Sequence, residues 1–295
     1  MQDAKAALGV DVKYVESKSN NDYVPNINAL IGEKCNLIIT VGFLMGDATT
    51  VAAKANPTVK FAIVDVGSDP KIPNLKGLQF NTAQSAFQAG YLAAGLSKSG
   101  IVATFGGLPI PPVTVYEDGF WEGVQYYNTK MNKQVKVLGW DEKNPKTGTM
   151  SGGFNDQAKG QQITKNFIQQ GADVIFPVAG SVGLGAAKEA QTQKKMLIWV
   201  DSDGYLTAPQ FKNVIVTSVI KGIDAAVKEA VTEAQAGTFS NKQFVGDLAN
   251  GGTLLSPFHD FDSAIPADLK AAVAKIGDDL KSGAIKLTSP NQPTS

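Results

Sequence analysis

The stretch Leu37 to Asp47, LIITVGFLMGD, holds a short continuous apolar run that ends at Gly42 and is followed by Phe43 and Asp47. An apolar run of this length predicts a strand buried in a parallel sheet. Open α/β sheets bind ligands in the crevice outside the carboxyl ends of their strands. Gly42, Phe43 and Asp47 are therefore candidate ligand contacts. The alternative is that Phe43 belongs to the core and Asp47 caps a helix over residues 48–55.

The composition is that of a globular chain without nucleic-acid or membrane features. Its 295 residues, 43% of them hydrophobic, suffice for two domains or one large one. The longest apolar runs fall far short of the ~20 residues that span a bilayer. All 27 basic residues are Lys, and 27 acidic residues balance them. Because Arg is the usual bidentate clamp for carboxylates and phosphates, its absence favours a neutral polar ligand.

The reactive side chains are too few for most catalytic or metal chemistry. A single cysteine, Cys35, and a single histidine, His259, exclude a disulfide framework and multi-histidine or cysteine-rich metal sites. Acid–base work would have to come from carboxylates or Lys221. We therefore expect a binding protein, not an enzyme, with no metal and no cofactor. Cys35 lacks a preceding apolar segment and is expected in the core, not as a lipid-attachment site.

Short strands alternate with amphipathic helices, which is the pattern of βαβ units and a parallel sheet. The loops at 106–114 and 201–213 are expected to be crossings between domains. The tail from Gly251 onward breaks this rhythm and is expected to wrap across both halves. The expected strands are 12–15, 37–41, 60–64, 78–81, 101–105, 134–138, 174–178, 196–200 and 214–219, and the expected helices are 82–98, 115–132, 158–170, 185–193 and 222–237.

A glycine-rich turn comes after the strand at 174–178. Its sequence, AGSVGLG from Ala179 to Gly185, lets the backbone at Gly180, Gly183 and Gly185 approach a ligand before a helix starts. A plain tight turn with glycines at left-handed positions is the alternative. A dinucleotide or Walker turn is disfavoured, because the segment matches neither motif.

Polar and aromatic candidates lie after other strands. Asp201 ends one strand and Asp203 comes shortly after it, where a carboxylate can hold paired hydroxyls; a helix cap fits Asp203 better than Asp201. Lys221 lies at a helix start, where the dipole disfavours it, so we expect a carboxylate or ligand partner unless it is simply solvated. Phe154, in the glycine-rich loop SGGFNDQAKG, has little core to join and is a candidate to stack on a flat ligand.

Taken in order, these motifs resemble the basic membrane protein family of bacterial substrate-binding lipoproteins, whose best-understood members bind purine nucleosides for ABC transporters. The resemblance covers nearly the whole chain and rests on TVGFLMGDA, GYLAAGLSKSGIVATFGG, EDGFWEGV, SGGFNDQAKG, GADVIFPVAGSVGLG, WVDSDGY and VTSVIKGID. It implies an α/β, type I periplasmic-binding-protein fold, with two Rossmann-like αβα lobes and a ligand cleft between them. The expected lobes are 1–104 with 212–238, and 105–211 with 239–295.

By motif match, the resemblance implies specific roles. Asp47 supplies the carboxylate of the first lobe and Phe154 the stacking aromatic of the second. Asp201 binds ribose hydroxyls, and Lys221 supports them or the ring. The backbone of Gly180 and Gly183 contacts the ligand, with Ala179 and Val182 in the same turn. The family commonly has a Gly-Thr-Gly type turn there, so Ser181 and Val182 are expected to alter ligand preference.

The resemblance also implies where the protein works. We expect a monomeric receptor that binds a nucleoside, hands it to an ABC transporter permease, and sits outside the cytoplasm, lipid-anchored or periplasmic. A receptor for a sugar or another neutral solute is one alternative, and a nucleoside hydrolase or phosphorylase is another. The family's signal peptide, lipid-attached cysteine and first strand, with its stacking aromatic, are not found in this sequence. We expect a truncated start.

Overall fold

A computed structural model describes residues 2–294, which divide into two compact units. Unit 1 comprises Met1–Phe80, Gly222–Gly246 and Pro293–Ser295, and unit 2 comprises Asn81–Lys221 and Asp247–Gln292. The described residues include no helix long and apolar enough to span a bilayer. The expected α/β class is confirmed.

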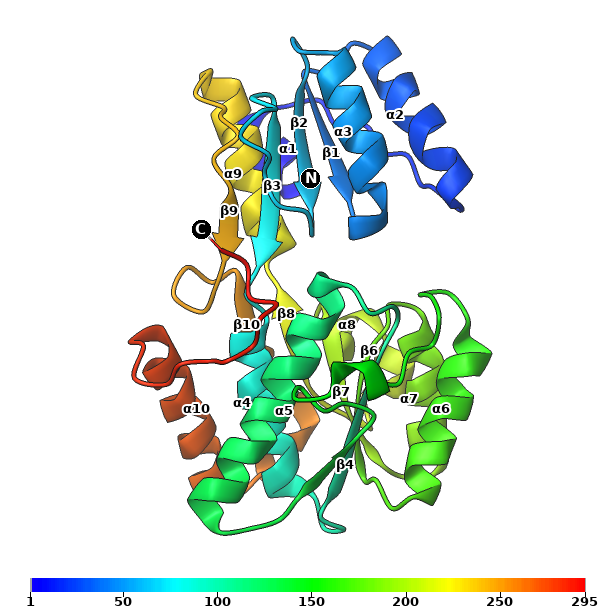
Figure 1. The fold of residues 1–295 in the computed structure, drawn as a ribbon, viewed down its shortest axis with the longest axis vertical. Coiled ribbons are helices and arrows are strands. Elements are labelled where there is room, and N and C mark those ends of the chain that lie inside the picture. Colours follow the sequence, from blue (N-terminus) through cyan, green and yellow to red (C-terminus); the bar gives the residue numbers. More distant parts are fainter. Residues whose placement is uncertain (1, 295) are drawn as a thin grey trace. The chain divides into compact units, whose positions relative to one another are not determined.

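Unit 1 is built on a four-stranded parallel sheet (Figure 1). Successive residues of a strand face opposite sides, so Ala62 and Val64 pack with α9 while Phe61 and Ile63 face the side of α2 and α3. The strands, in the order β1-β2-β3-β9, are β1 (Leu37–Val41), β2 (Lys60–Val64), β3 (Leu75–Phe80) and β9 (Phe244–Gly246), and the helices are α1 (Gln2–Leu8), α2 (Tyr23–Gly32), α3 (Gly46–Ala55) and α9 (Ile223–Ala236).

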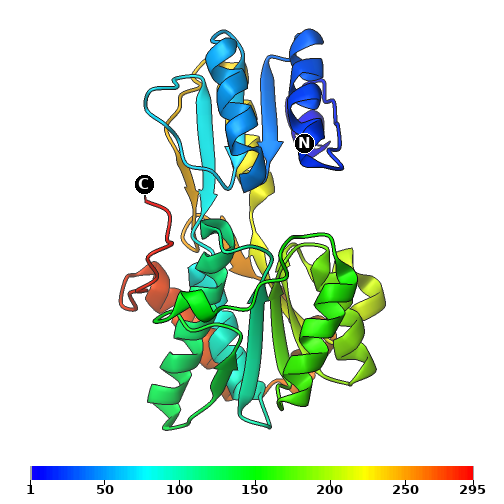
Figure 2. The same cartoon turned by 45° about the vertical axis from the view of Figure 1, so that its right-hand side comes forward.

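Unit 2 is built on a six-stranded sheet that is parallel except for β10. Val174 and Phe176 join the core formed with α4 and α5, whereas Ile175 joins the core formed with α6 and α7. These two pairs of helices lie on opposite faces of the sheet (Figures 1 and 2). The strands, in the order β10-β8-β7-β6-β4-β5, are β10 (Thr253–Leu255), β8 (Ile215–Lys221), β7 (Met196–Asp201), β6 (Val174–Val178), β4 (Ile101–Gly106) and β5 (Lys136–Leu138). The helices are α4 (Ala83–Leu96), α5 (Pro111–Met131), α6 (Gln157–Gln169), α7 (Val182–Thr192), α8 (Gly204–Thr207) and α10 (Ala267–Lys281).

Glycines set the close approach of α4 and α5. A Cβ added at Gly90 of α4 would collide with the backbone carbonyl of Phe120, and one added at Gly123 would collide with that of Phe87. Gly90 and Gly123 therefore lie where the backbones of the two helices meet. This contact fixes α5, whose side chains reach the functional site.

Most expected strands are present, with ends shifted by a few residues, but the prediction of a strand at 12–15 is wrong. That segment is coil, with the Tyr14 side chain 82% exposed. A strand forms only where a neighbour satisfies its backbone groups, and among the described residues β1 pairs only with β2. The short strands β9 and β10 and the helices α2 and α10 were not predicted.

The division into units differs from the expected lobe boundaries. Residues 81–104, assigned to the first lobe, supply α4 and β4 of unit 2. Residues 212–221 supply β8 of unit 2, and residues 244–246 supply β9 of unit 1. The chain passes between units in short links such as Phe80–Asn81, and the Pro-containing loop at 106–114 lies inside unit 2.

Carboxylates on α5 and in the loop after β5 hold the C-terminal segment of unit 2. Glu122 accepts the backbone N–H groups of Thr288 and Ser289 at 2.9–3.0 Å, and Glu142 accepts the Thr288 hydroxyl at 3.2 Å. Burial, and then the nearby Glu122 and Asp118, raise the pKa of Glu142 to about 7. The folded protein therefore binds a proton at Glu142 more tightly than the unfolded chain does.

Gly90→Ala should destabilise the protein, because the new methyl group has no space between α4 and α5. Overpacking of this kind costs about 1–3 kcal/mol, which thermal unfolding detects as a lower Tm. Gly153→Ala is the control, because a Cβ there meets no atom within 4 Å. Equal melting temperatures for Gly90→Ala and the wild type would refute the close-packing argument.

Glu142→Gln should remove part of the pH dependence of stability. At pH values between the usual pKa of a glutamate and about 7, the folded state binds more protons at Glu142 than the unfolded chain does. The contribution of Glu142 to the stability of the wild type therefore falls as pH rises through this range. The glutamine variant should gain stability relative to wild type at pH 8 and lose this advantage at pH 5. Denaturant unfolding at both pH values measures the difference, and a variant that is less stable than wild type at pH 8 would contradict the assignment.

Candidate functional site

The candidate site lies where the carboxyl ends of β4, β6, β7 and β8 meet in unit 2. These strands are consecutive neighbours in the sheet and run parallel, so the segments after them emerge at one edge. They carry Gly106, the Ala179–Gly183 turn, Asp201 and Lys221.

Asp201, Tyr116 and Lys221 form one connected polar group at this edge. The Tyr116 hydroxyl donates to Asp201 Oδ1 at 2.8 Å, and Lys221 Nζ lies 3.3 Å from the same oxygen. Lys221 Nζ also lies 5.6 Å from the centroid of the Tyr116 ring. With its side chain 8% exposed, Lys221 is not a solvated surface lysine, and Asp201 is the carboxylate partner that its position predicted.

Asp201 remains available for further hydrogen bonds. Its side chain keeps 45% of its surface exposed, and the contacts from Tyr116 and Lys221 are both made to Oδ1. It ends β7 with φ of +66°, a conformation that non-glycine residues rarely adopt. The surrounding structure therefore holds this carboxylate in a specific place and orientation.

Phe154 is fixed at the same edge by backbone contacts. Its carbonyl accepts the Ser181 hydroxyl at 2.6 Å and the Val182 N–H at 3.2 Å. A Cβ at Gly107 would overlap the Phe154 ring, and one at Gly180 would lie 3.3 Å from Phe154 Cβ. The ring is half-buried and packs against the core on the α4 and α5 side, so the expectation that it has little core to join is wrong.

The glycines of the Ala179–Gly185 turn serve different purposes. Gly180 has φ of +56°, as the tight-turn alternative requires, and also borders Phe154. A Cβ at Gly183 would make only an ordinary contact with Trp199, 3.5 Å away. A Cβ at Gly185 would collide with the carbonyl of Gln157, so Gly185 is needed for packing of α7 on α6. The side chains of Ala179 and Val182 are buried, which restricts any ligand contact of theirs to the backbone.

Asp203 is engaged within the protein. Its carboxylate accepts the Tyr205 N–H at 3.1 Å as the cap of α8, and His259 Nε2 lies 2.8 Å from Oδ2. The helix-cap alternative is therefore confirmed for Asp203. Of the two neighbouring carboxylates, Asp201 is the better placed to contact a ligand.

The unit 1 candidates lie just after β1. Gly42 has φ of +113°, and Phe43, at 37% exposure, lies outside the core in a short 3-10 helix (Phe43–Met45). Asp47 is exposed in the first turn of α3, which begins at Gly46 with Met45 as its N-cap. The alternatives of a buried Phe43 and an Asp47 cap are thus both wrong.

Sequence patterns did not indicate Tyr116, Gly107 or Glu117. Tyr116 lies 85 residues before its partner Asp201, and no local signal predicts that pairing. Glu117, next to Tyr116, is buried, and its burial and the neighbouring Asp118 raise its pKa well above the usual value.

This arrangement suits binding more than catalysis. It offers a carboxylate for hydroxyl groups, a half-buried aromatic ring and backbone groups at glycines. Among residues 2–294 no cluster of three or more His, Cys, Asp or Glu side chains could hold a metal ion.

Comparison with known proteins identifies the family. The model of the Bmp family, described as "ABC transporter substrate-binding protein PnrA-like", matches residues 1–276. A Lactococcus lactis protein named "ABC transporter nucleoside-binding protein BmpA" is 31% identical over 96% of this chain and 79% of its own length. An "Uncharacterized lipoprotein" from Pyrococcus horikoshii is 30% identical over 80% of this chain and 58% of its own length.

Solved structures of other proteins have the same fold. A crystal structure of ABC transporter solute-binding proteins from Aeropyrum pernix superposes with a TM-score of 0.83 and 25% identity, covering 98% of this chain and 87% of that one. The expected type I periplasmic-binding-protein fold is confirmed. The family is one of transport receptors and not of enzymes. The chain therefore belongs to the Bmp family of PnrA-like ABC transporter substrate-binding proteins.

Proposed function

We propose that this ABC transporter substrate-binding protein captures a nucleoside, most suitably a purine nucleoside, and delivers it to its permease. The observation that carries the proposal is the Asp201 carboxylate, oriented by Tyr116 and Lys221 at the same sheet edge as Phe154. A carboxylate with an exposed edge can accept two hydroxyl groups, as a ribose diol offers them. An aromatic ring near it can stack on a flat base.

The balance of charge supports an uncharged ligand. Asp201 and Lys221 form an ion pair, burial raises the pKa of Glu117 well above its usual value, and the whole sequence contains no Arg. A phosphate would bring two negative charges next to Asp201 without a bidentate partner. A nucleoside therefore fits the site better than a nucleotide, and the name of the Lactococcus lactis relative agrees with that class.

The remaining candidates take supporting roles in this proposal. The backbone of Gly180 and Gly183, with Ala179 and Val182, borders the ligand, and Lys221 holds the ribose hydroxyls or the ring. Asp47 supplies a carboxylate contact from unit 1, with Gly42 and Phe43 as weaker candidates from the same unit. Asp203 acts indirectly because its carboxylate is already engaged.

We also propose that the protein works as a monomer outside the cytoplasm, in the periplasm or lipid-anchored at the outer face of the cytoplasmic membrane. A receptor for an importer must meet its ligand on that side. The Pyrococcus horikoshii relative is named a lipoprotein, which supports the same location.

Calorimetric titration of the protein with inosine, adenosine, guanosine and ribose tests the ligand class. At least one purine nucleoside should bind at least about tenfold more tightly than ribose, because stacking on an aromatic ring adds about 1–3 kcal/mol. A sugar receptor on the same fold would instead prefer ribose or another sugar. Tighter binding of ribose than of every nucleoside would refute the proposal, as would no binding by any of the four.

Two substitutions test which part of the ligand Asp201 and Phe154 each contact. Asp201→Asn should weaken nucleoside and ribose binding alike by about tenfold or more, since hydrogen bonds to a charged group are lost. Phe154→Leu keeps an apolar side chain against Gly107 but removes the ring, so it should weaken nucleoside binding and leave ribose binding nearly unchanged. Asp278→Asn, at a carboxylate with 78% of its side chain exposed, is the matched control. The same loss for both ligands in Phe154→Leu would contradict the stacking role.

A further inference from the structure

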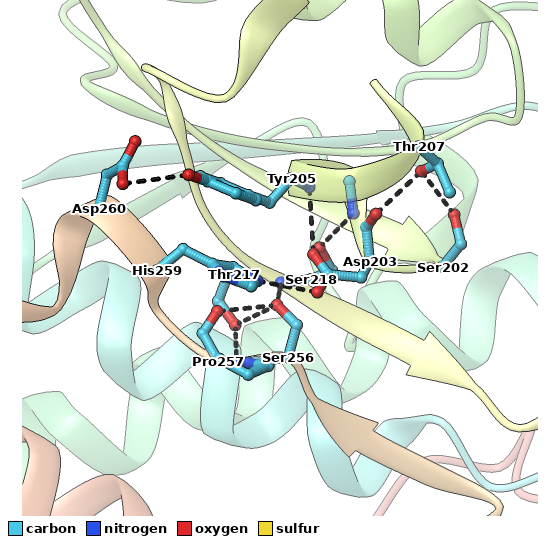
Figure 3. Close-up of polar contacts among 11 residues, drawn as sticks. Ser202, Asp203, Tyr205, Thr207, Thr217, Ser218, Ser256, Pro257, His259 and Asp260 are labelled. Atoms are coloured by element: carbon cyan, nitrogen blue, oxygen red, sulfur yellow. Dashed lines mark hydrogen bonds and ion pairs between the residues drawn. The ribbon is translucent and has the colours of Figure 1, made fainter. Parts of the chain in front are cut away.

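A clamp of three side chains, those of Asp203, Tyr205 and His259, holds the segment just after Asp201 (Figure 3). Asp203 accepts a hydrogen bond from the Tyr205 N–H at 3.1 Å and lies 2.8 Å from His259 Nε2. The His259 ring stacks on the Tyr205 ring, with centroids 4.1 Å apart and planes 11° from parallel. A carboxylate can only accept, so the imidazole Nε2–H donates to Asp203.

Both sides of this clamp are anchored on the same strand, β8. The Gly204 N–H donates to the Ser218 hydroxyl at 2.9 Å, which fixes the start of α8. The segment that carries His259 is fixed through Ser256: its Oγ accepts the Ser218 N–H at 2.8 Å, and its N–H donates to the Ser218 carbonyl at 2.9 Å. Ser218 and Ser256 are buried, so these contacts exchange little with water.

The clamp controls a strained turn. Asp201 has φ of +66°, and the Ser202 N–H donates to the Val200 carbonyl at 2.8 Å, so the chain bends sharply at Asp201. A non-glycine residue in this region of φ is unfavourable and persists only where its neighbours over-determine it. After the turn, the Ser202 hydroxyl lies 3.0 Å from the Thr207 hydroxyl, and Asp203 is held by Tyr205 and His259.

The two neighbouring carboxylates differ in their contacts. Asp201 and Asp203 flank Ser202, and either could accept hydroxyl groups. The contacts from Tyr205 and His259 engage Asp203, whereas the Asp201 side chain stays 45% exposed. Two further charged groups contact Tyr205: Asp260 accepts its hydroxyl at 3.1 Å, and Lys212 Nζ lies 5.5 Å from its ring centroid.

We infer that His259 is a positioning residue for ligand binding: through Asp203 and Tyr205 it holds the Asp201 turn in its binding conformation. The inference rests on the proposed function, in which Asp201 contacts the ligand. His259 lies in the tail segment, outside the βα repeats. Through His259, this segment contributes to ligand affinity.

A double-mutant cycle tests whether His259 acts through Asp201. His259→Phe keeps a ring to stack on Tyr205 and removes the hydrogen bond to Asp203; the affinity for the best-binding purine nucleoside should fall about tenfold. In the Asp201→Asn background the same change should cost less than about twofold, because the carboxylate that it positions is already gone. His259→Gln, which retains a donor, should recover part of the affinity.

A second measurement does not depend on the ligand. Hydrogen exchange of peptides covering residues 201–207 should be faster in His259→Phe than in wild type, with the β4 and β6 peptides unchanged. If wild type binds no nucleoside, the proposed function fails and hydrogen exchange alone decides whether His259 holds the turn. Unchanged exchange overturns the inference. So does a loss of affinity that is equally large with Asp201 and with Asn at that position.

Discussion

The carboxylate of Asp201 is the point on which the candidate site depends. It is placed by three separate constraints: the end of β7, the hydroxyl of Tyr116 on α5, and the ammonium group of Lys221 at the end of β8. Each constraint comes from a different element, so the position of the carboxylate depends on the correct packing of α5 against the sheet. The opposite charges of Asp201 and Lys221 lie 3.3 Å apart and attract one another.

The packing of unit 2 serves this placement. Gly90, Gly119 and Gly123 allow α4 and α5 to approach until backbone touches backbone, which sets where the amino-terminal half of α5 carries Tyr116. Gly160 and Gly185 do the same for α6 and α7, whose first residues flank Phe154. The candidate residues are thus positioned by helices that pack closely together, and Gly180 and Asp201 themselves adopt positive φ angles.

The fold class and much of the site could be predicted from the sequence, because both depend on local patterns. Continuous apolar runs identified β1 and β6, and the positions of Phe154, Asp201 and Lys221 near strand ends or helix starts made them candidates. The strand expected at 12–15 failed because strand formation depends on a partner that local sequence does not describe. β9 and β10, with three residues each, are too short to produce a periodic signal. Tyr116 and His259 were missed because their partners lie far away along the chain, at Asp201 and Asp203.

A crystal structure of the protein with a bound purine nucleoside, such as inosine, is the most direct test of the role of Asp201. We predict that ribose hydroxyls lie within hydrogen-bond distance of the Asp201 carboxylate, that the base stacks on Phe154, and that Asp203 still contacts His259. A nucleoside bound with its ribose away from Asp201, or with no contact between its base and Phe154, would contradict this prediction.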